Sequence, residues 1–252
     1  MLTPKQLEQF KTDGFLVLRG LFPEADAEIW RDECKRILGL GLADQFNLRT
    51  HPHFLAPGIW IVDRVEPVID ISPTFAELAG HEIFRSLLTQ IFDDVPLLFK
   101  DKLVYKMVGT PGYGIHQDYS WWQEFPPEIV NVMIAIDSAD AGNGALEFFA
   151  GRHGRLLTPP NAGRNFNREE VNLLTGAPPQ MIETHPGDVV LFHCMLPHRS
   201  GPNRSSNLRR QLYLTYSSAR NGDFYSRQLQ LLRDQRPLRG PNSDQRESFY
   251  FR

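Results

Sequence analysis

A short motif, His116-Gln117-Asp118, carries the residue types in this chain that are best suited to chemistry. It follows an alternating, strand-like run over residues 103–107 and precedes an aromatic cluster. Residues two apart in an extended segment point to the same face, so His116 and Asp118 could offer a nitrogen and an oxygen to one metal ion. Because this spacing also arises by chance, a histidine satisfied in the core or at the surface is the alternative interpretation.

A third candidate ligand lies far downstream, where His198 follows a second strand-like run over residues 188–193. Two histidines and one carboxylate on one side of an ion leave three positions open, which is the arrangement of non-haem iron(II) oxygenases. The sequence therefore offers His116, Asp118 and His198 as a candidate iron site.

Length and charge limit the classes of protein to which this chain can belong. Barrels and sandwiches of about 250 residues are often one domain, so we expect a single domain over residues 1–252, with a less ordered tail from about residue 234. The net charge is −3, and the 27 lysines and arginines are scattered along the chain. Such a chain has no basic field for nucleic acid, which we do not expect as a partner. The sequence leaves the oligomeric state open.

The cysteines and the hydropathy pattern indicate the compartment. Cys34 and Cys194 are far apart in sequence, which favours packed, reduced thiols over a disulfide framework. The N-terminus has no charged-then-apolar leader, and no run approaches 18 uninterrupted apolar residues. These features predict a cytoplasmic protein without a membrane segment.

Helices are predicted mainly in the first third of the chain. Thr3 is placed to cap a helix that begins at Pro4 and ends by Gly14, with Gln6 completing a capping box. Apolar residues at helical spacing predict further helices over residues 25–38, 73–92 and 225–232. Five apolar residues of the second helix are expected to pack on a sheet: Ile29, Trp30, Cys34, Ile37 and Leu38.

The pattern then changes to short strands separated by Gly, Pro and Asn turns. Besides an early strand at residues 15–18, strands are predicted at residues 97–107, 129–136, 146–149, 181–183, 189–192 and 211–217. Helices followed by strands favour an antiparallel β core with helices on one face. Residues 155–180 form a long insertion, rich in Pro and Gly, which we expect near the mouth of the core.

Two segments resemble sites but are interpreted as connections. Residues 40–58 are expected to form a surface loop, in which His51 and His53 flank a proline and favour an exposed loop over a ligand pair. The glycine-rich run at residues 109–114 could bind phosphate only if a helix followed it. The strand that carries His116 follows instead, so we interpret that run as a turn.

Side-chain alternation predicts which faces of two strands point inward. Leu212 and Leu214 suit a face covered by helices, which leaves the opposite face, and with it a barrel interior, to Arg209, Gln211 and Tyr213. In the strand at residues 97–107, one face carries Lys102, Val104 and Lys106. An ammonium group that is buried without an anion loses its hydration, so these lysines indicate either an anionic guest or strand ends in solvent.

An ordered series of motifs resembles the phytanoyl-CoA dioxygenase family. After the His116 motif come residues 143–153 (NGALEFFAGRH), Pro186-Gly187-Asp188 before a strand, and residues 198–203 (HRSGPN) with Arg209. Residues 2–22 resemble the N-terminus of the same family. The likeness covers about residues 1–218, and the order of the motifs is far more specific than any one of them.

The resemblance implies a fold and a reaction. The fold would be mainly β with flanking helices, built on a double-stranded β-helix, the cupin-like jelly roll. The protein would bind iron(II) and 2-oxoglutarate and use molecular oxygen to hydroxylate, or otherwise oxidise, a small polar metabolite, with succinate and carbon dioxide as products. Some relatives that halogenate lack the carboxylate ligand. Because Asp118 is present here, the resemblance favours hydroxylation.

The family's functional residues transfer to matching positions of this chain. His116, Asp118 and His198 match the iron ligands, and Arg209 matches the arginine that holds the distal carboxylate of 2-oxoglutarate. A planar guanidinium can hold a carboxylate through two parallel hydrogen bonds. Ser200 resembles a hydroxyl that supports the same carboxylate, with a turn-capping serine as the alternative, and Lys102 is a further candidate for cosubstrate binding.

The substrate cannot be selected from the sequence, but its position can be predicted. We expect it beside Tyr119, Trp121 and Trp122, whose ring faces would form a cage for an amine or quaternary ammonium, while Lys102 and Lys106 take an anionic end. Either tryptophan could instead be a core or lid residue, since adjacent strand residues cannot both face one pocket. Two other classes stay open: a metalloenzyme with the same ligands that does not use 2-oxoglutarate, and a non-catalytic jelly-roll binding protein.

Overall fold

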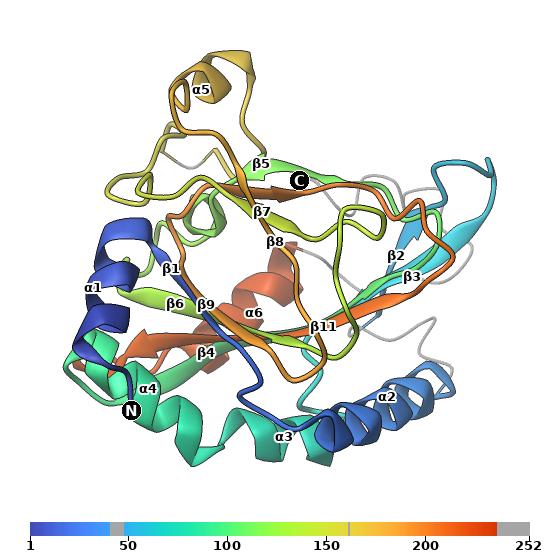
Figure 1. The fold of residues 1–252 in the computed structure, drawn as a ribbon, viewed down its shortest axis with the longest axis horizontal. Helices are drawn as coiled ribbons and strands as arrows, with labels where there is room; N and C mark the ends of the chain where they lie inside the picture. Colours follow the sequence, from blue (N-terminus) through green and yellow to red (C-terminus); the bar gives the residue numbers. More distant parts are fainter. Residues whose placement is uncertain (41–47, 161, 236–252) are drawn as a thin grey trace.

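Two antiparallel β-sheets face one another in the computed structural model, which describes residues 1–40, 48–160 and 162–235 (Figure 1). The larger sheet contains, in spatial order, β1 (Phe15–Leu18), β9 (Val189–His193), β6 (Ile129–Ala135), β11 (Arg209–Ser218), β4 (Pro96–Lys106), β3 (Trp60–Val65) and β2 (Leu48–Pro52). The smaller sheet contains β5 (Tyr113–His116), β10 (His198–Ser200), β7 (Leu146–Phe148) and β8 (Gln180–Ile182). The expected mainly β, jelly-roll architecture is confirmed.

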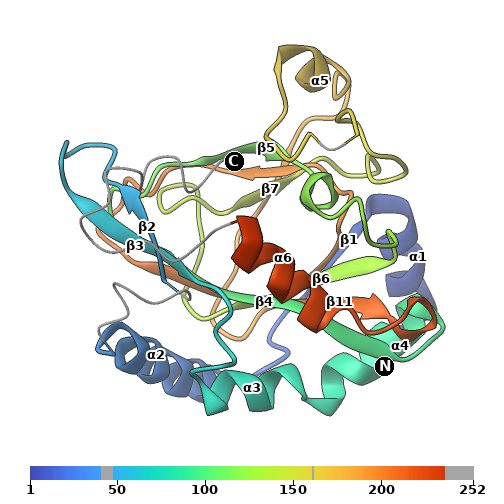
Figure 2. The same ribbon diagram turned by 180° about the vertical axis from the view of Figure 1, so that it is seen from behind.

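The helices lie mostly on the outer side of the larger sheet. That side is covered by α2 (Glu24–Leu38), α3 (Pro73–Ala79) and α4 (Glu82–Phe92), while α1 (Pro4–Asp13) packs beside β1 (Figure 1). The predicted capping box of Thr3 and Gln6 is present, and Gly14 ends α1 in the left-handed conformation. The short helix α5 (Arg168–Asn172) lies in the long insertion, and α6 (Tyr225–Gln235) lies on the opposite side of the larger sheet from α3 (Figure 2).

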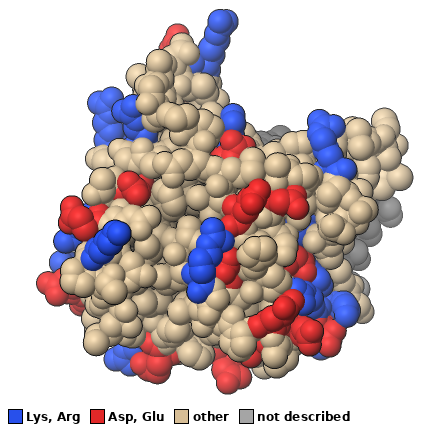
Figure 3. Space-filling view, in the orientation of Figure 1, with Lys and Arg blue, Asp and Glu red and all other residues tan. Residues whose placement is uncertain are grey.

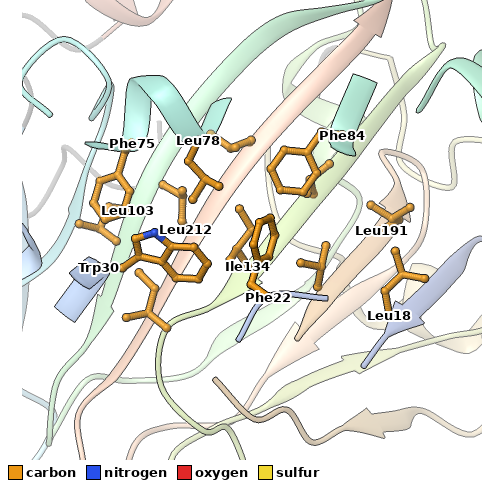
Figure 4. Packing of buried hydrophobic residues seen from close by; sticks show 14 of the residues in the cluster. Leu18, Phe22, Trp30, Phe75, Leu78, Phe84, Leu103, Ile134, Leu191 and Leu212 are labelled. Carbon is orange, nitrogen blue, oxygen red and sulfur yellow. The ribbon is translucent and has the colours of Figure 1, made fainter. Parts of the chain in front are cut away.

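Strand alternation divides the apolar core into two clusters. The outer cluster joins the larger sheet to the helices and includes Trp30, Phe75, Phe84, Leu103, Leu191 and Leu212 (Figure 4). The inner cluster lies between the sheets and includes Phe15, Val104, Met133, Phe148 and Tyr213. The predicted inward face of β11 and the helix-covered positions of Leu212 and Leu214 are therefore confirmed.

The predicted apolar face of α2 is correct only in its central stripe. Trp30, Cys34 and Ile37 are buried at helical spacing, but Ile29 is 58% exposed and Leu38 is 37% exposed. Ile29 precedes Trp30 by one position, which rotates its side chain about 100° away from the sheet. The buried face of this helix also includes Ala27 and Glu33.

The single helical region predicted for residues 73–92 is divided into α3 and α4. Gly80 ends α3, and the His81 side chain caps α4 by accepting a hydrogen bond from the Ile83 backbone at 3.1 Å. Histidine as a helix cap is uncommon, which explains why the sequence pattern did not separate the two helices.

The surface loop expected at residues 40–58 is partly wrong. Residues 48–52 form β2, which pairs with β3, and neither strand was predicted; residues 41–47 lie outside the described part of the chain. His53 is half-buried, and its Nδ1 accepts a hydrogen bond from the Leu55 backbone, so it is satisfied locally. The glycine-rich run at residues 109–114 is a turn that leads into β5, as predicted.

Other sequence predictions concern the surface and the compartment. Cys34 and Cys194 are free and buried, as expected. Within the described residues, no helix has the length and apolar character needed to cross a membrane. Lys and Arg lie among Asp and Glu on the face shown in Figure 3. The division into one domain stays a prediction, and most of the tail from residue 234 lies outside the described residues.

Candidate active site

Two strands of the smaller sheet bring the proposed metal ligands together. His116 is the last residue of β5 and pairs across the sheet with His198, the first residue of β10. Asp118 does not continue the strand, as the sequence had suggested, but begins a 3-10 helix over Asp118–Trp121. One ligand atom from each of the three side chains lies within 4.8 Å of the others. Asp118 Oδ1 is 3.8 Å from His116 Nε2, and Asp118 Oδ2 is 4.0 Å from His198 Nε2.

Hydrogen bonds behind the ligands fix their orientation. The Nδ1 atoms of His116 and His198 lie 2.8 and 2.9 Å from the carbonyl oxygens of Gly114 and Leu196. A proton on each Nδ1 would satisfy these carbonyls and leave each Nε2 lone pair directed at the centre. Asn131 donates to Asp118 Oδ2 at 3.0 Å. The ligands are therefore held before any ion arrives.

The protonation states also suit metal binding. Burial, reinforced by the neighbouring His198, lowers the pKa of His116 to about 3, and burial likewise lowers the pKa of His198. Burial opposes ionisation of Asp118, but nearby positive charge, foremost that of Lys102, outweighs it and holds the pKa of this carboxyl below its usual value. Neutral imidazoles and an ionised carboxylate are the forms that bind a divalent ion, so the donor set fits iron(II).

Two buried cations mark a second part of the site. Arg209 is 1% exposed, and sheet pairing places Lys106, which is also buried, directly beside it. The Arg209 Nη1 atom donates to the Gly144 carbonyl at 3.1 Å, whereas its Nε has no hydrogen-bond partner among the described residues. Asp63 acts on both cations, but it is itself paired with Arg64. A buried guanidinium whose Nε lacks a partner calls for an anion, and a carboxylate of 2-oxoglutarate fits this requirement.

Ser200 completes this cationic end of the site. Its Oγ accepts a hydrogen bond from Lys106 Nζ at 2.7 Å, which leaves its own hydroxyl proton free to donate into the cavity. Ser200 lies within β10 and not in a turn, which favours the cosubstrate role over turn capping. Lys106 does not line the cavity. Its expected role at the anionic end of the substrate therefore does not fit its position, and it belongs with Arg209.

Lys102 lies on the wall of the same cavity. Five cationic side chains line this cavity among the described residues: Arg64, Lys100, Lys102, Arg199 and Arg209. Three of them form ion pairs, Arg64 with Asp63, Lys100 with Glu66, and Arg199 with Glu147. The Lys102 ammonium instead lies 4.9 Å from the centre of the Tyr213 ring. Within the described chain no carboxylate is within 4.0 Å of it, so it is available to a ligand.

A profile of the phytanoyl-CoA dioxygenase family matches residues 10–211. The chain belongs to the phytanoyl-CoA dioxygenase family. The motif series identified in the sequence is thus confirmed as a family signature. The match ends within β11, so the helix α6 lies beyond it.

Individual members of the family and solved structures agree with this assignment. A methylphosphonate hydroxylase of Gimesia maris is 30% identical over 233 residues, covering 88% of this chain and 83% of that protein. A 2-aminoethylphosphonate dioxygenase of an uncultured bacterium is 25% identical over 246 residues, covering 97% and 92%. EctD from S. alaskensis with bound Fe matches with a TM-score of 0.77 at 21% identity, covering 87% and 78%. The structural match shows a shared fold.

Family membership and the convergent ligands make this chain an iron(II)- and 2-oxoglutarate-dependent dioxygenase, and neither of the two alternative classes. The iron and 2-oxoglutarate supply oxygen activation, with succinate and carbon dioxide as products. His116, Asp118 and His198 would hold the ion from one side, and Arg209 would orient the cosubstrate. Asp118, His198 and Arg209 are buried, which limits the access of water to the reacting groups.

The aromatic segment of this dioxygenase differs from the strand that was expected. Because residues 118–121 form a 3-10 helix, Trp121 and Trp122 both line the cavity. Trp121 packs edge-on against His116, with ring centres 5.5 Å apart. Tyr119 does not line the cavity, and its hydroxyl donates to the Phe125 carbonyl at 2.8 Å. A direct substrate contact therefore fits the two tryptophans but not Tyr119.

Two further residues of the site were missed by sequence reasoning. Asn131 is a polar residue within the apolar strand β6, and that exception was the available signal. Gln117 lies between two ligands and was passed over, although its amide bonds to the backbone of Arg155, Leu157 and Met195. Its side chain thereby holds the insertion against the metal motif. Asn131 and Gln117 therefore position the metal ligands but are not ligands themselves.

Proposed function

We propose that this dioxygenase hydroxylates a small organophosphonate. Its relatives include proteins named for methylphosphonate and 2-aminoethylphosphonate. The observation that carries the proposal is Lys102, a cation on the cavity wall with no carboxylate within ion-pair distance among the described residues. Lys102 is half-buried, and the carboxylate on which its charge acts, Asp118, is a proposed metal ligand, so this position favours an anionic substrate.

The substrate anion and the cosubstrate anion have separate partners. Lys106 lies opposite Arg209 in the paired strands, whereas Lys102 lies opposite Tyr213. The two lysines are four residues apart on β4, which corresponds to about 13 Å along a strand. In this structure the Lys106 ammonium is hydrogen-bonded to Ser200, whereas the Lys102 ammonium lies over the Tyr213 ring. We therefore assign Arg209 and Ser200, whose hydroxyl accepts a hydrogen bond from Lys106, to the distal carboxylate of 2-oxoglutarate, and Lys102 to the substrate.

The position of Lys102 also suits the reaction. Its charge is the strongest electrostatic influence on Asp118 after burial, which supports a place next to the metal ligands. A phosphonate held by Lys102 would present its neighbouring carbon toward the ion. In the balanced reaction, one oxygen atom enters that C–H bond and the other enters succinate, while 2-oxoglutarate loses carbon dioxide.

A matched pair of anions tests the proposal. Succinate formation is measured with ethylphosphonate and with propionate, which have the same carbon chain and differ in the anionic group. We expect stimulation by ethylphosphonate and little by propionate, because a phosphonate offers more charge and more acceptor oxygens. Equal stimulation by propionate, or none by any small alkylphosphonate, would contradict the proposal.

Variants then test Lys102. Lys102→Met is expected to raise the KM for ethylphosphonate by about tenfold to a hundredfold, because it removes the charge partner without shortening the side chain. The KM for 2-oxoglutarate should change little. Lys5→Met, at an exposed position on α1, is the control and should change neither constant.

A cytoplasmic location, which the two free, buried cysteines favour, is part of the same proposal.

A further inference from the structure

The C-terminal helix α6 forms one wall of the cavity. Gln228, Leu231 and Leu232 of this helix line it together with Trp121 and Trp122. In Figure 2, α6 lies between the two sheets, in front of the space that they enclose. The helix lies outside residues 10–211, which the family profile matches, so the family assignment says nothing about its role.

Several contacts fix α6 in place. The Tyr225 hydroxyl donates to the buried Asp101 carboxylate at 2.9 Å, and Arg227 forms an ion pair of 2.8 Å with Glu124. Leu231 packs in the apolar cluster of Trp122 and Phe125. These contacts join the helix to β4 and to the segment that follows the metal motif. The side chains that α6 directs into the cavity are therefore held in defined positions.

Gln228 is the polar residue of this wall. The residue is 5% exposed, its side-chain amide has no hydrogen-bond partner among the described residues, and the amide is not among the fully enclosed polar atoms that lack a partner. An amide that is reached from the cavity and has no protein partner can hydrogen-bond a polar group of a bound molecule. The other α6 residues in the wall are leucines, which leave the Gln228 amide to a molecule inside the cavity.

The charges of the cavity indicate what that molecule carries. Asp118 is the only carboxylate among the described lining residues, and it is a proposed metal ligand. The Trp122 ring already has the Lys100 ammonium 5.5 Å from its centre, so that ring face is not open to a substrate cation. An ammonium on the substrate would therefore find no carboxylate among the described lining residues other than the proposed metal ligand.

We propose that Gln228 determines substrate specificity by hydrogen-bonding an uncharged polar tail of the phosphonate. Lys102 binds the anionic group, and α6 faces the other end of the molecule. A hydroxyl tail satisfies the Gln228 amide, whereas an ammonium tail finds no free carboxylate among the described lining residues. This inference rests on the proposed function, and it replaces the cation-binding aromatic cage predicted from the sequence.

Two phosphonates of the same length test the inference: 2-hydroxyethylphosphonate and 2-aminoethylphosphonate. The wild-type protein is expected to have the higher kcat/KM for the hydroxyl compound. Gln228→Glu supplies the missing carboxylate and should shift the ratio toward the amine by at least about tenfold. Gln230→Glu makes the same change at an exposed position two residues away and should leave the ratio unchanged.

A second variant keeps the test decisive if a buried glutamate weakens folding. Gln228→Leu preserves side-chain size and removes hydrogen bonding. It should lower binding of 2-hydroxyethylphosphonate relative to ethylphosphonate, measured by anaerobic titration calorimetry of protein loaded with iron(II) and 2-oxoglutarate. The inference is overturned if wild-type protein prefers the amine, or if both Gln228 variants leave the ratios as Gln230→Glu does. If no phosphonate stimulates wild-type turnover, the proposed function fails first.

Discussion

The two faces of the paired strands β4 and β11 have opposite characters. The outer face meets the helices through Leu103, Tyr105, Leu212 and Leu214, all in the outer apolar cluster. The inner face carries Lys102, Lys106, Arg209 and Tyr213. Because successive strand residues alternate between faces, the same two segments contribute to stability on one side and to chemistry on the other.

The outer face contributes favourably to the free energy of folding, whereas the inner face lowers stability. Apolar area removed from water on the outer face contributes about 25 cal/mol per Å². On the inner face, buried cations lose hydration, which lowers stability until a ligand supplies an anion. Substitutions on the two faces should therefore separate folding from activity.

The largest effect on activity should come from the metal ligands. His116→Ala, Asp118→Ala and His198→Ala should each abolish succinate formation, because two remaining ligands hold the ion poorly. The circular dichroism spectrum should stay that of the wild type, since the core clusters are untouched. Iron content after anaerobic loading provides an independent measurement. Full turnover in two of the three variants would refute the ligand assignment.

The largest effect on stability should come from the outer face. Leu212→Ala, at a fully buried position, should lower the free energy of unfolding by about 2–5 kcal/mol, measured by urea denaturation. The KM for 2-oxoglutarate of the folded variant should not change. A changed KM for 2-oxoglutarate with unchanged stability would mean that the outer face contributes to cosubstrate binding and not to folding.

Two adjacent arginines provide a sharper comparison. Arg209 faces the cavity, whereas Arg210 faces outward and pairs with Asp137 at 2.7 Å. Arg209→Lys should weaken 2-oxoglutarate binding by about tenfold to a hundredfold, because one ammonium cannot replace a two-bonded guanidinium. Arg210→Lys should leave that affinity unchanged and affect only stability. Isothermal titration of the iron-loaded protein would distinguish them, and equal losses would contradict the assignment.

The smallest effect concerns the pH dependence of stability. Burial, with Arg209 adding to it, lowers the pKa of Lys106 to about 6, below its value of 10.5 in the unfolded chain, while Asp63 opposes the shift. Between these values the unfolded state binds more protons, so this group makes the ligand-free protein less stable as pH falls from about 10 to 6. The slope is at most about 1.4 kcal/mol per pH unit.

Lys106→Met should remove that contribution. Urea denaturation of the two proteins at several pH values would show a flatter profile for the variant over this window. An unchanged profile would mean that Lys106 keeps its proton in the folded protein. Lys5→Met, at an exposed position, serves as the control.

Most features that depend on side-chain periodicity, or on the order of the motifs along the chain, were predicted from the sequence. Alternation correctly assigned Arg209 and Leu212 to opposite faces, because a buried sheet fixes strand register. The ordered motifs identified the family, and His116, Asp118 and His198 do converge. Local capping signals placed α1 correctly.

The remaining differences arise from tertiary contacts that no local pattern encodes. The 3-10 helix after Gln117 turns both Trp121 and Trp122 toward the cavity, which a continuing strand would not allow. Lys106 differs from Lys102 because its ammonium donates to Ser200 of β10, a contact between strands that are far apart in sequence. Gln228 joins the site through the packing of α6 on a segment a hundred residues earlier in the chain, as in the Arg227 ion pair with Glu124.

The stoichiometry of phosphonate oxidation tests the central claim most directly. Iron(II)-loaded protein is supplied with oxygen, 2-oxoglutarate and methylphosphonate, and both the oxidised phosphonate and succinate are quantified. The account predicts one oxidised phosphonate for each phosphonate-dependent succinate, with the Lys102→Met variant requiring a higher phosphonate concentration for the same rate. Succinate formation that is independent of every small phosphonate, or that proceeds without oxidised phosphonate, would contradict it.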